Sequence, residues 1–224
     1  MTSDSTLISG GYCLARPTHR LDWLLPALPE FVLSGSGCLT EYVDDNALTG
    51  CMPHTEGGVR EMAEQLGRSA EDVRSIQDLF VSMCVAGEFE YPRYFTTPAA
   101  ARRLVPLLGR WTSGLTLVGM STLPGDAAAI ISGLNSQRTY EAVLARNQPP
   151  EPGEVLGWDV LGTDYSDFHS WFCGGADKSI PVSVNAHGFI DSLADAQRVA
   201  DYCNIPNNAE PGHWAPWQIR RYPL

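Results

Sequence analysis

The sequence predicts an α+β fold in which a single mixed sheet is flanked by several helices. Two observations lead to this class. Short, β-prone apolar runs, such as 115–120 and 155–162, are interspersed with segments whose apolar residues recur at helical spacing, such as 73–83. Hydrophobic residues make up 44% of the 224 residues and charged residues only 18%, which provides enough apolar surface for a buried core.

The length of the chain limits its domain organisation to one sizeable domain or two small ones. The best candidate linker is the proline cluster at 149–152. Because this cluster is only a few residues long, we interpret it as a loop inside one domain. We therefore predict a disordered N-terminus at 1–10, where residues are small and polar, and a single α+β domain at 11–224.

The N-terminal quarter is predicted to hold two short strands, at 11–16 and 30–34, and two loops. The Gly/Ser-rich loop at 34–37 follows a strand, as phosphate-binding loops do. It lacks their lysine and their full spacing, so we interpret it as a plain turn. Cys51 and His54 have a spacing that can chelate a metal, but no second pair of ligands lies nearby, so a loop without metal is favoured.

Two helices in the middle of the chain have clear start signals. Ser69 precedes two acidic residues and an apolar stripe, which predicts an N-capped helix that ends near Gly87. Thr97 and Pro98 open the next helix, because proline is favoured at the first helical position. The stripe of the first helix is assigned to the core and consists of Val73, Ile76, Phe80 and Met83.

The elements that follow are of both types. We predict strands at 115–120, 155–162 and 180–184, and helices at 127–134, 135–147 and 192–204. The strand at 155–162 has two largely apolar faces, and its Gly157 and Gly162 permit the close approach of a backbone or a ligand. The aromatic tail at 214–224 alternates in part and is typical of a closing edge strand.

The stretch 166–175 holds the densest group of reactive side chains. Ser166 is a good helix N-cap and the Gly174-Gly175 pair suits a helix end, so we predict a helix. In a helix, His169 and Cys173 lie four residues apart and share one face. An imidazole beside a thiol supplies a base and a nucleophile.

Two kinds of chemistry are open to this group. In the first, Cys173 is a nucleophile activated by His169, which Asp164 orients from the preceding loop. In the second, His169 is a general acid–base with Tyr165 or Asp164 as its partner, and Cys173 only packs. The predicted substrate pocket consists of Trp158, Ser170, Trp171 and Phe172. A purely structural role stands beside both, since His and Cys residues between aromatic side chains are often buried for packing.

The charge balance limits the partners. The chain has 15 Lys and Arg against 26 Asp and Glu, a net charge of −11, which disfavours nucleic acid and anionic membranes. No run approaches the roughly 18 apolar residues that a membrane span needs. The N-terminus also lacks the pattern of a secretory signal. The six irregularly spaced cysteines are therefore expected to be thiols in the cytoplasm.

Three segments of the C-terminal third resemble a group of bacterial single-domain proteins of about this length. They are Gly157-Trp158-Asp159-Val160-Leu161-Gly162, then Phe168-His169-Ser170-Trp171 with Cys173-Gly174, then the ending from Pro216-Trp217 to Tyr222-Pro223-Leu224. The resemblance implies a single compact domain. It carries no activity or site residue over to this chain.

Two functions are hypotheses at this point. The first is a small-molecule-processing enzyme of bacterial specialised metabolism that uses no cofactor or metal, since no nucleotide-binding glycine motif is present. The alternative is a non-enzymatic acidic binding protein, such as an immunity protein that neutralises a basic toxin. A pocket that reaches His169 favours the enzyme. A broad acidic face, with His169 buried and its polar atoms satisfied, favours the binding protein.

Overall fold

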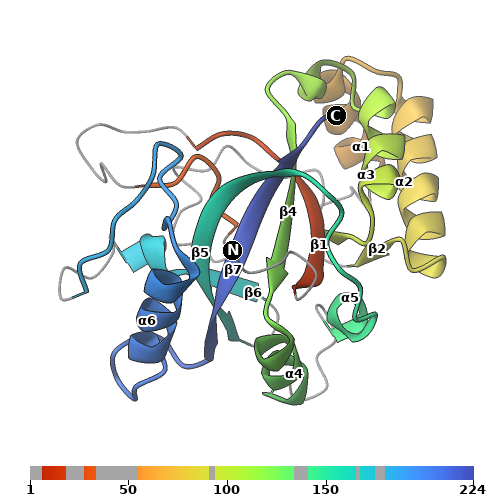
Figure 1. Ribbon diagram of the computed structural model, residues 1–224. Helices are drawn as coiled ribbons and strands as arrows, with labels where there is room; N and C mark the ends of the chain where they lie inside the picture. Colours follow the sequence, from red (N-terminus) through yellow and green to blue (C-terminus); the bar gives the residue numbers. More distant parts are fainter. Residues whose placement is uncertain are drawn as a thin grey trace.

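The computed structural model describes residues 7–18, 28–33, 55–90, 94–133, 141–164, 167–174 and 180–224. Its strands form one seven-stranded sheet in the order β2-β3-β1-β4-β7-β5-β6 (Figure 1). The strands are β1 (Ile8–Ala15), β2 (Phe89–Glu90), β3 (Tyr94–Phe95), β4 (Thr116–Thr122), β5 (Glu154–Asp164), β6 (Asp167–Ser170) and β7 (His213–Tyr222). The α+β class is thus confirmed. Each pair of neighbouring strands is antiparallel, so this sheet is not mixed in strand direction.

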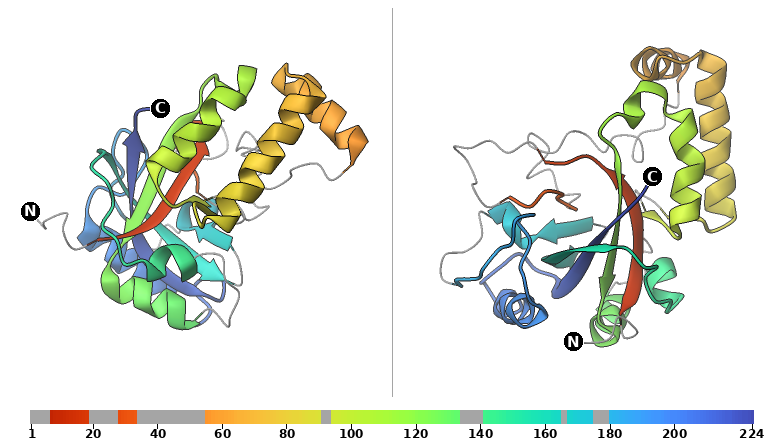
Figure 2. Two further views of the ribbon diagram at one scale, coloured as in Figure 1. Left: turned by 90° about the vertical axis from the view of Figure 1, so that its right-hand side faces the viewer. Right: turned by 45° about the horizontal axis from the view of Figure 1, so that its top comes forward.

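The helices lie in three groups around the sheet (Figures 1 and 2). The first group is α1 (Glu56–Leu66), α2 (Ala70–Val85) and α3 (Pro98–Leu104), the second is α4 (Pro124–Gly133) with α5 (Glu141–Ala145), and the third is α6 (Leu193–Cys203). Short 3₁₀ helices span Val105–Leu107, Gly109–Thr112 and Trp171–Gly174. Within the described ranges, no helix combines the length and apolar character that crossing a membrane requires.

The helix α2 forms where its capping signals predict it. The Ser69 side chain accepts a hydrogen bond from the Asp72 amide at 3.1 Å, and the Asp72 carboxylate accepts from the Ser69 amide at 3.0 Å. This reciprocal capping box satisfies two amides that the first helical turn leaves without partners. The predicted stripe is buried, which confirms it as core: Val73, Ile76, Phe80 and Met83. The preceding helix α1 was not predicted.

Alternate residues of the central strands face different core clusters, as the two-residue period of a strand requires. Leu117 of β4 packs with α1, α2 and α3, while its neighbour Val118 packs on the opposite face with Phe31 and Phe189. A third cluster lies between α6 and β5 and includes Val160. The two sides of the sheet are therefore buried by different parts of the chain.

Three predictions about strands are wrong. Residues 30–33 form no strand, and Val184 makes only an isolated bridge with Ile190. The aromatic tail is β7, but it is a central strand between β4 and β5 and not an edge strand. The reason is visible in its burial: Trp214 and Trp217 belong to different clusters, so β7 has apolar neighbours on both faces.

Several other predictions concern residues that are partly or wholly outside the described part. Of the predicted disordered segment 1–10, residues 1–6 lie outside it, whereas Ile8, Ser9 and Gly10 belong to β1. The loop at 34–37 and the Cys51–His54 pair also lie outside it. Residues 135–140 of the predicted helix 135–147 also lie outside the described part, and Glu141–Ala145 is helical as predicted.

Candidate functional site

The stretch predicted as a helix at 166–175 is a strand followed by a 3₁₀ helix, so that prediction is wrong. β6 pairs with β5 through Leu161 and Ser170, and through Gly162 and His169. The pairing with a buried, apolar strand outweighs the local helix signals. His169 belongs to the strand and Cys173 to the 3₁₀ helix, so the two residues are not four positions apart on one α-helix.

The side chains of Asp164 and Cys173 are not among those described, and Tyr165 lies outside the described residues. The two chemistries predicted for them with His169 therefore stay predictions.

The residues predicted to form an aromatic pocket are packed in the core. Trp158, Trp171 and Phe172 are buried in the cluster that α6 covers. The rings of Trp171 and Phe172 meet edge to face, with their centroids 5.3 Å apart. Their contacts are thus those of a core, in which aromatic rings pack edge to face. A cavity lies elsewhere, lined by residues that include Tyr12, Thr96, Arg146 and Glu151, and it contains none of the predicted site residues.

His169 is paired with a carboxylate that the sequence did not suggest. Its Nδ1 lies 2.8 Å from Oε2 of Glu210, and its side chain is 17% exposed. Glu210 belongs to the loop before β7, and its carbonyl accepts a hydrogen bond from the Trp214 indole at 2.9 Å. Gly162 of β5 pairs with Trp214 of β7 on one side and with His169 of β6 on the other. The imidazole is therefore held at the edge of the sheet by tertiary contacts.

Ser170 also has a partner that the sequence did not suggest. Its Oγ lies 2.9 Å from both carboxylate oxygens of Asp159, and both residues are buried. Burial raises the pKa of Asp159 to about 7, although hydrogen bonds from Ser170 and from the Val160 amide act in the opposite direction. Asp159 is the one carboxylate within the predicted apolar strand 155–162, which marks it as unusual, but no local pattern identifies Ser170 as its partner.

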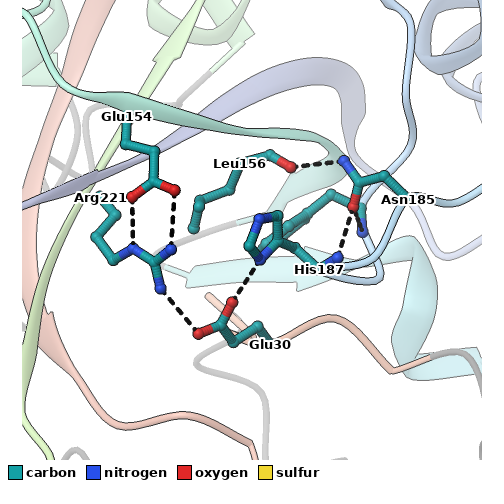
Figure 3. A network of polar contacts seen from close by, with 7 residues as sticks. Glu30, Glu154, Leu156, Asn185, His187 and Arg221 are labelled. Carbon is teal, nitrogen blue, oxygen red and sulfur yellow. Dashed lines mark hydrogen bonds and ion pairs between the residues drawn. The ribbon is translucent and has the colours of Figure 1, made fainter.

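A larger polar cluster joins four segments that are far apart in the sequence (Figure 3). Arg221, near the end of β7, donates from Nε and Nη2 to the two oxygens of Glu154 at 2.9 Å each. Its Nη1 donates to Glu30 at 3.1 Å, and the other oxygen of Glu30 lies 2.8 Å from Nδ1 of His187. Glu30 lies 191 residues from Arg221 and 157 from His187, so no local pattern could predict this cluster.

Backbone contacts fix the same cluster in place. Asn185 donates to the Leu156 carbonyl at 2.7 Å and accepts from the His187 amide at 2.9 Å (Figure 3). The Glu30 amide donates to the His187 carbonyl at 2.7 Å. The segment 28–33 and the turn at 185–188 are thereby tied to β5 and β7. Glu30 orients the imidazole of His187, as the partner of a general base does. The guanidinium of Arg221 already binds two carboxylates, Glu154 and Glu30, so these contacts occupy the donors that could bind an anionic ligand.

The helices α1 and α2 present an acidic surface. Six carboxylates in this helical hairpin are exposed: Glu56, Glu61, Glu64, Glu71, Asp72 and Asp78. The hairpin holds three arginines, Arg60, Arg68 and Arg74, so its balance is 3 − 6 = −3. Arg74 forms an ion pair with Glu56 at 2.7 Å, which neutralises part of its charge.

Comparison of the chain with protein-family models, with curated proteins and with solved structures finds no match in any of the three.

Proposed function

We propose that this chain is a non-enzymatic acidic binding protein that docks a basic protein partner, in the manner of an immunity protein that occludes a toxin. The proposal depends on one observation: α1 and α2 expose six carboxylates against three arginines. A surface of one sign attracts partners of the opposite sign and speeds their association. The net charge of the whole chain, −11, has the same sign as this surface and adds to the attraction of a basic partner.

The placement of the predicted pocket residues also supports a binding role. Trp158, Trp171 and Phe172 form core contacts, and His169 is mostly buried against Glu210. These are the features that we expect of a chain whose partner binds on its surface. The proposal places the chain in the cytoplasm, where its cysteines remain thiols.

The test uses the basic proteins that are encoded by genes adjacent to the gene for this chain. Each is mixed with the chain at 150 mM salt and analysed by size-exclusion chromatography and calorimetry. We expect a stable complex with one of them. We expect the triple variant Glu61→Lys, Glu64→Lys and Asp78→Lys to weaken it at least about tenfold, because three attractive charges become repulsive.

The matched control reverses three exposed carboxylates elsewhere: Glu151→Lys, Asp191→Lys and Asp201→Lys. It changes the net charge equally but leaves the hairpin intact, so we expect a smaller loss of affinity. Circular dichroism confirms that both triple variants are folded. Equal losses in the two variants, or no complex with any of these proteins, would overturn the proposal.

A second candidate function is cofactor-free acid–base catalysis on a small molecule at His169. The observation that favours it is the carboxylate partner, Glu210, at 2.8 Å from the imidazole. A thermal-shift screen of metabolites tests it, because a ligand that binds only the native state raises the melting temperature. We expect His169→Gln to keep the fold and to abolish turnover of any metabolite found. Unchanged turnover in this variant rejects the candidate.

A further inference from the structure

The outward face of α2 combines acidic and apolar side chains in one line. The residues of this stripe, which we call the α2 stripe, are Glu71, Arg74, Asp78, Val81 and Val85. Their alternating spacings of three and four residues place them on one side of the helix, away from the buried stripe of Val73, Ile76, Phe80 and Met83. In Figure 1, α2 lies on the side of its group that is away from the sheet.

The apolar end of the α2 stripe is unusually exposed. Val85 is 85% exposed and Val81 is 64% exposed, the two highest values among the large exposed hydrophobic residues that the structure describes. The two valines are one helical turn apart, so they form one continuous patch and not two isolated contacts. Together they offer apolar area that a partner could bury beside the carboxylates of the same face.

The acidic end of the α2 stripe favours a partner with positive charge. No ion pair between described residues involves Glu71 or Asp78, whereas Arg74 is bound by Glu56 at 2.7 Å. The stripe therefore carries an uncompensated negative charge next to its apolar patch. The α2 stripe of a second copy would offer these carboxylates only Arg74, which Glu56 already binds, and an anionic membrane would repel them.

We infer that the α2 stripe docks a basic amphipathic helix of a partner protein. Apolar side chains of that helix cover Val81 and Val85, while its Lys or Arg side chains face Glu71 and Asp78. The spacing of the stripe is that of a coiled-coil seam, which suits a second helix rather than a strand. This inference rests on the proposed binding function and adds the docking face and the form of the partner.

The test uses three synthetic helical peptides as probes. The first has Leu at the two seam positions of each heptad and Lys at the flanking positions. The second replaces each Lys with Gln, and the third replaces each Leu with Ser. We expect the Leu/Lys peptide to bind with the highest affinity in calorimetry at 150 mM salt, and to shift the amide resonances of α2 in NMR spectra.

The double variant Val81→Ser and Val85→Ser should weaken binding of the Leu/Lys peptide about tenfold or more, because partial burial of two valines is lost. The matched control is Val155→Ser with Val184→Ser, two valines that are 47% and 40% exposed outside α2. We expect no change in affinity for this control. Melting temperatures confirm that both double variants are folded.

The outcomes separate this inference from the proposed function. If the Leu/Lys peptide shifts resonances outside α2, or if both double variants bind it equally, the docking face is wrong while an acidic binding protein still stands. Equal binding of the Gln peptide overturns the basic character of the partner. Concentration-dependent dimers that the Val81 and Val85 substitutions abolish would show that a second copy occupies the face, which also overturns the inference.

Discussion

The hydroxyl of Ser170 lies 2.9 Å from each carboxylate oxygen of the fully buried Asp159. Ser170 also accepts a hydrogen bond from the Phe172 amide at 3.2 Å, and Asp159 accepts one from the Val160 amide at 2.7 Å. The pair thus joins β5 to the short strand β6 and to the 3₁₀ helix that follows it. A buried carboxylate is tolerated there because its oxygens have donors.

The first prediction concerns the pH dependence of stability that Asp159 causes. Its pKa is raised to about 7 in the folded chain, above the value in the unfolded chain. The folded state therefore binds a proton more tightly, and this contribution to stability is complete below about pH 4 and is lost as the pH rises through about 7. The total loss is on the order of 3–5 kcal/mol.

Urea denaturation between pH 4 and pH 8 measures this effect. We expect Asp159→Asn to remove this contribution, so that the difference in unfolding free energy between wild type and variant shifts in favour of the variant as pH rises. The exposed substitution Asp191→Asn is the control and should follow the wild type. Parallel pH curves for wild type and Asp159→Asn would contradict the prediction.

The second prediction concerns the close contact between Gly162 and Trp214. A Cβ at Gly162 would lie 2.5 Å from the indole of Trp214, which is shorter than side-chain atoms tolerate. We expect Gly162→Ala to destabilise the fold by about 1–3 kcal/mol, because the ring must move within a packed core. Thermal and urea unfolding measure the change.

Gly125→Ala is the matched control for that substitution. Gly125 lies in α4, and a Cβ there would meet no atom within 4 Å. Alanine has the higher helix propensity, so this variant should be as stable as wild type or slightly more stable. Similar losses of stability in both variants would show that the contact with Trp214 is not the cause.

The third prediction concerns the N-cap of α2. Ser69→Ala removes the acceptor of the Asp72 amide and should lower the unfolding free energy by about 1 kcal/mol. Ser75→Ala, an exposed substitution inside the same helix, should be neutral or slightly stabilising. Urea denaturation of the two variants tests the difference. A neutral Ser69→Ala would mean that packing alone determines where α2 begins.

The fourth prediction concerns the ion pair of Arg221 with Glu154. A double-mutant cycle with Arg221→Met and Glu154→Gln should give a favourable coupling energy at low salt, which decreases at high salt because both side chains are partly exposed. The pair of Arg198 and Asp195, at 3.3 Å on one helix, is the comparison and should couple less. If the coupling of Arg221 is zero at low salt, the contact contributes nothing to stability.

The candidate site shows where prediction from the sequence reaches its limit. The predicted partner of His169 was Asp164, whose side chain is outside the described ones. The carboxylate that the structure places at His169 is Glu210, which is 41 positions away and in another loop. Asp159 lies in the predicted strand 155–162 and Ser170 in the stretch 166–175, yet nothing in their spacing indicates that they meet. Cross-strand register sets these pairs, and register depends on the whole sheet.

The sequence by itself determined the α+β class, the N-cap and the buried stripe of α2, the start of α3 and the strand β5. These features depend on hydrophobic periodicity and capping within about one or two helical turns, which are local properties of the chain. Only the tertiary structure decided that β7 is a central strand, that 167–170 is a strand, and that Glu30 meets His187 and Arg221. These outcomes depend on which distant segments bury one another, and no short stretch of residues encodes that choice.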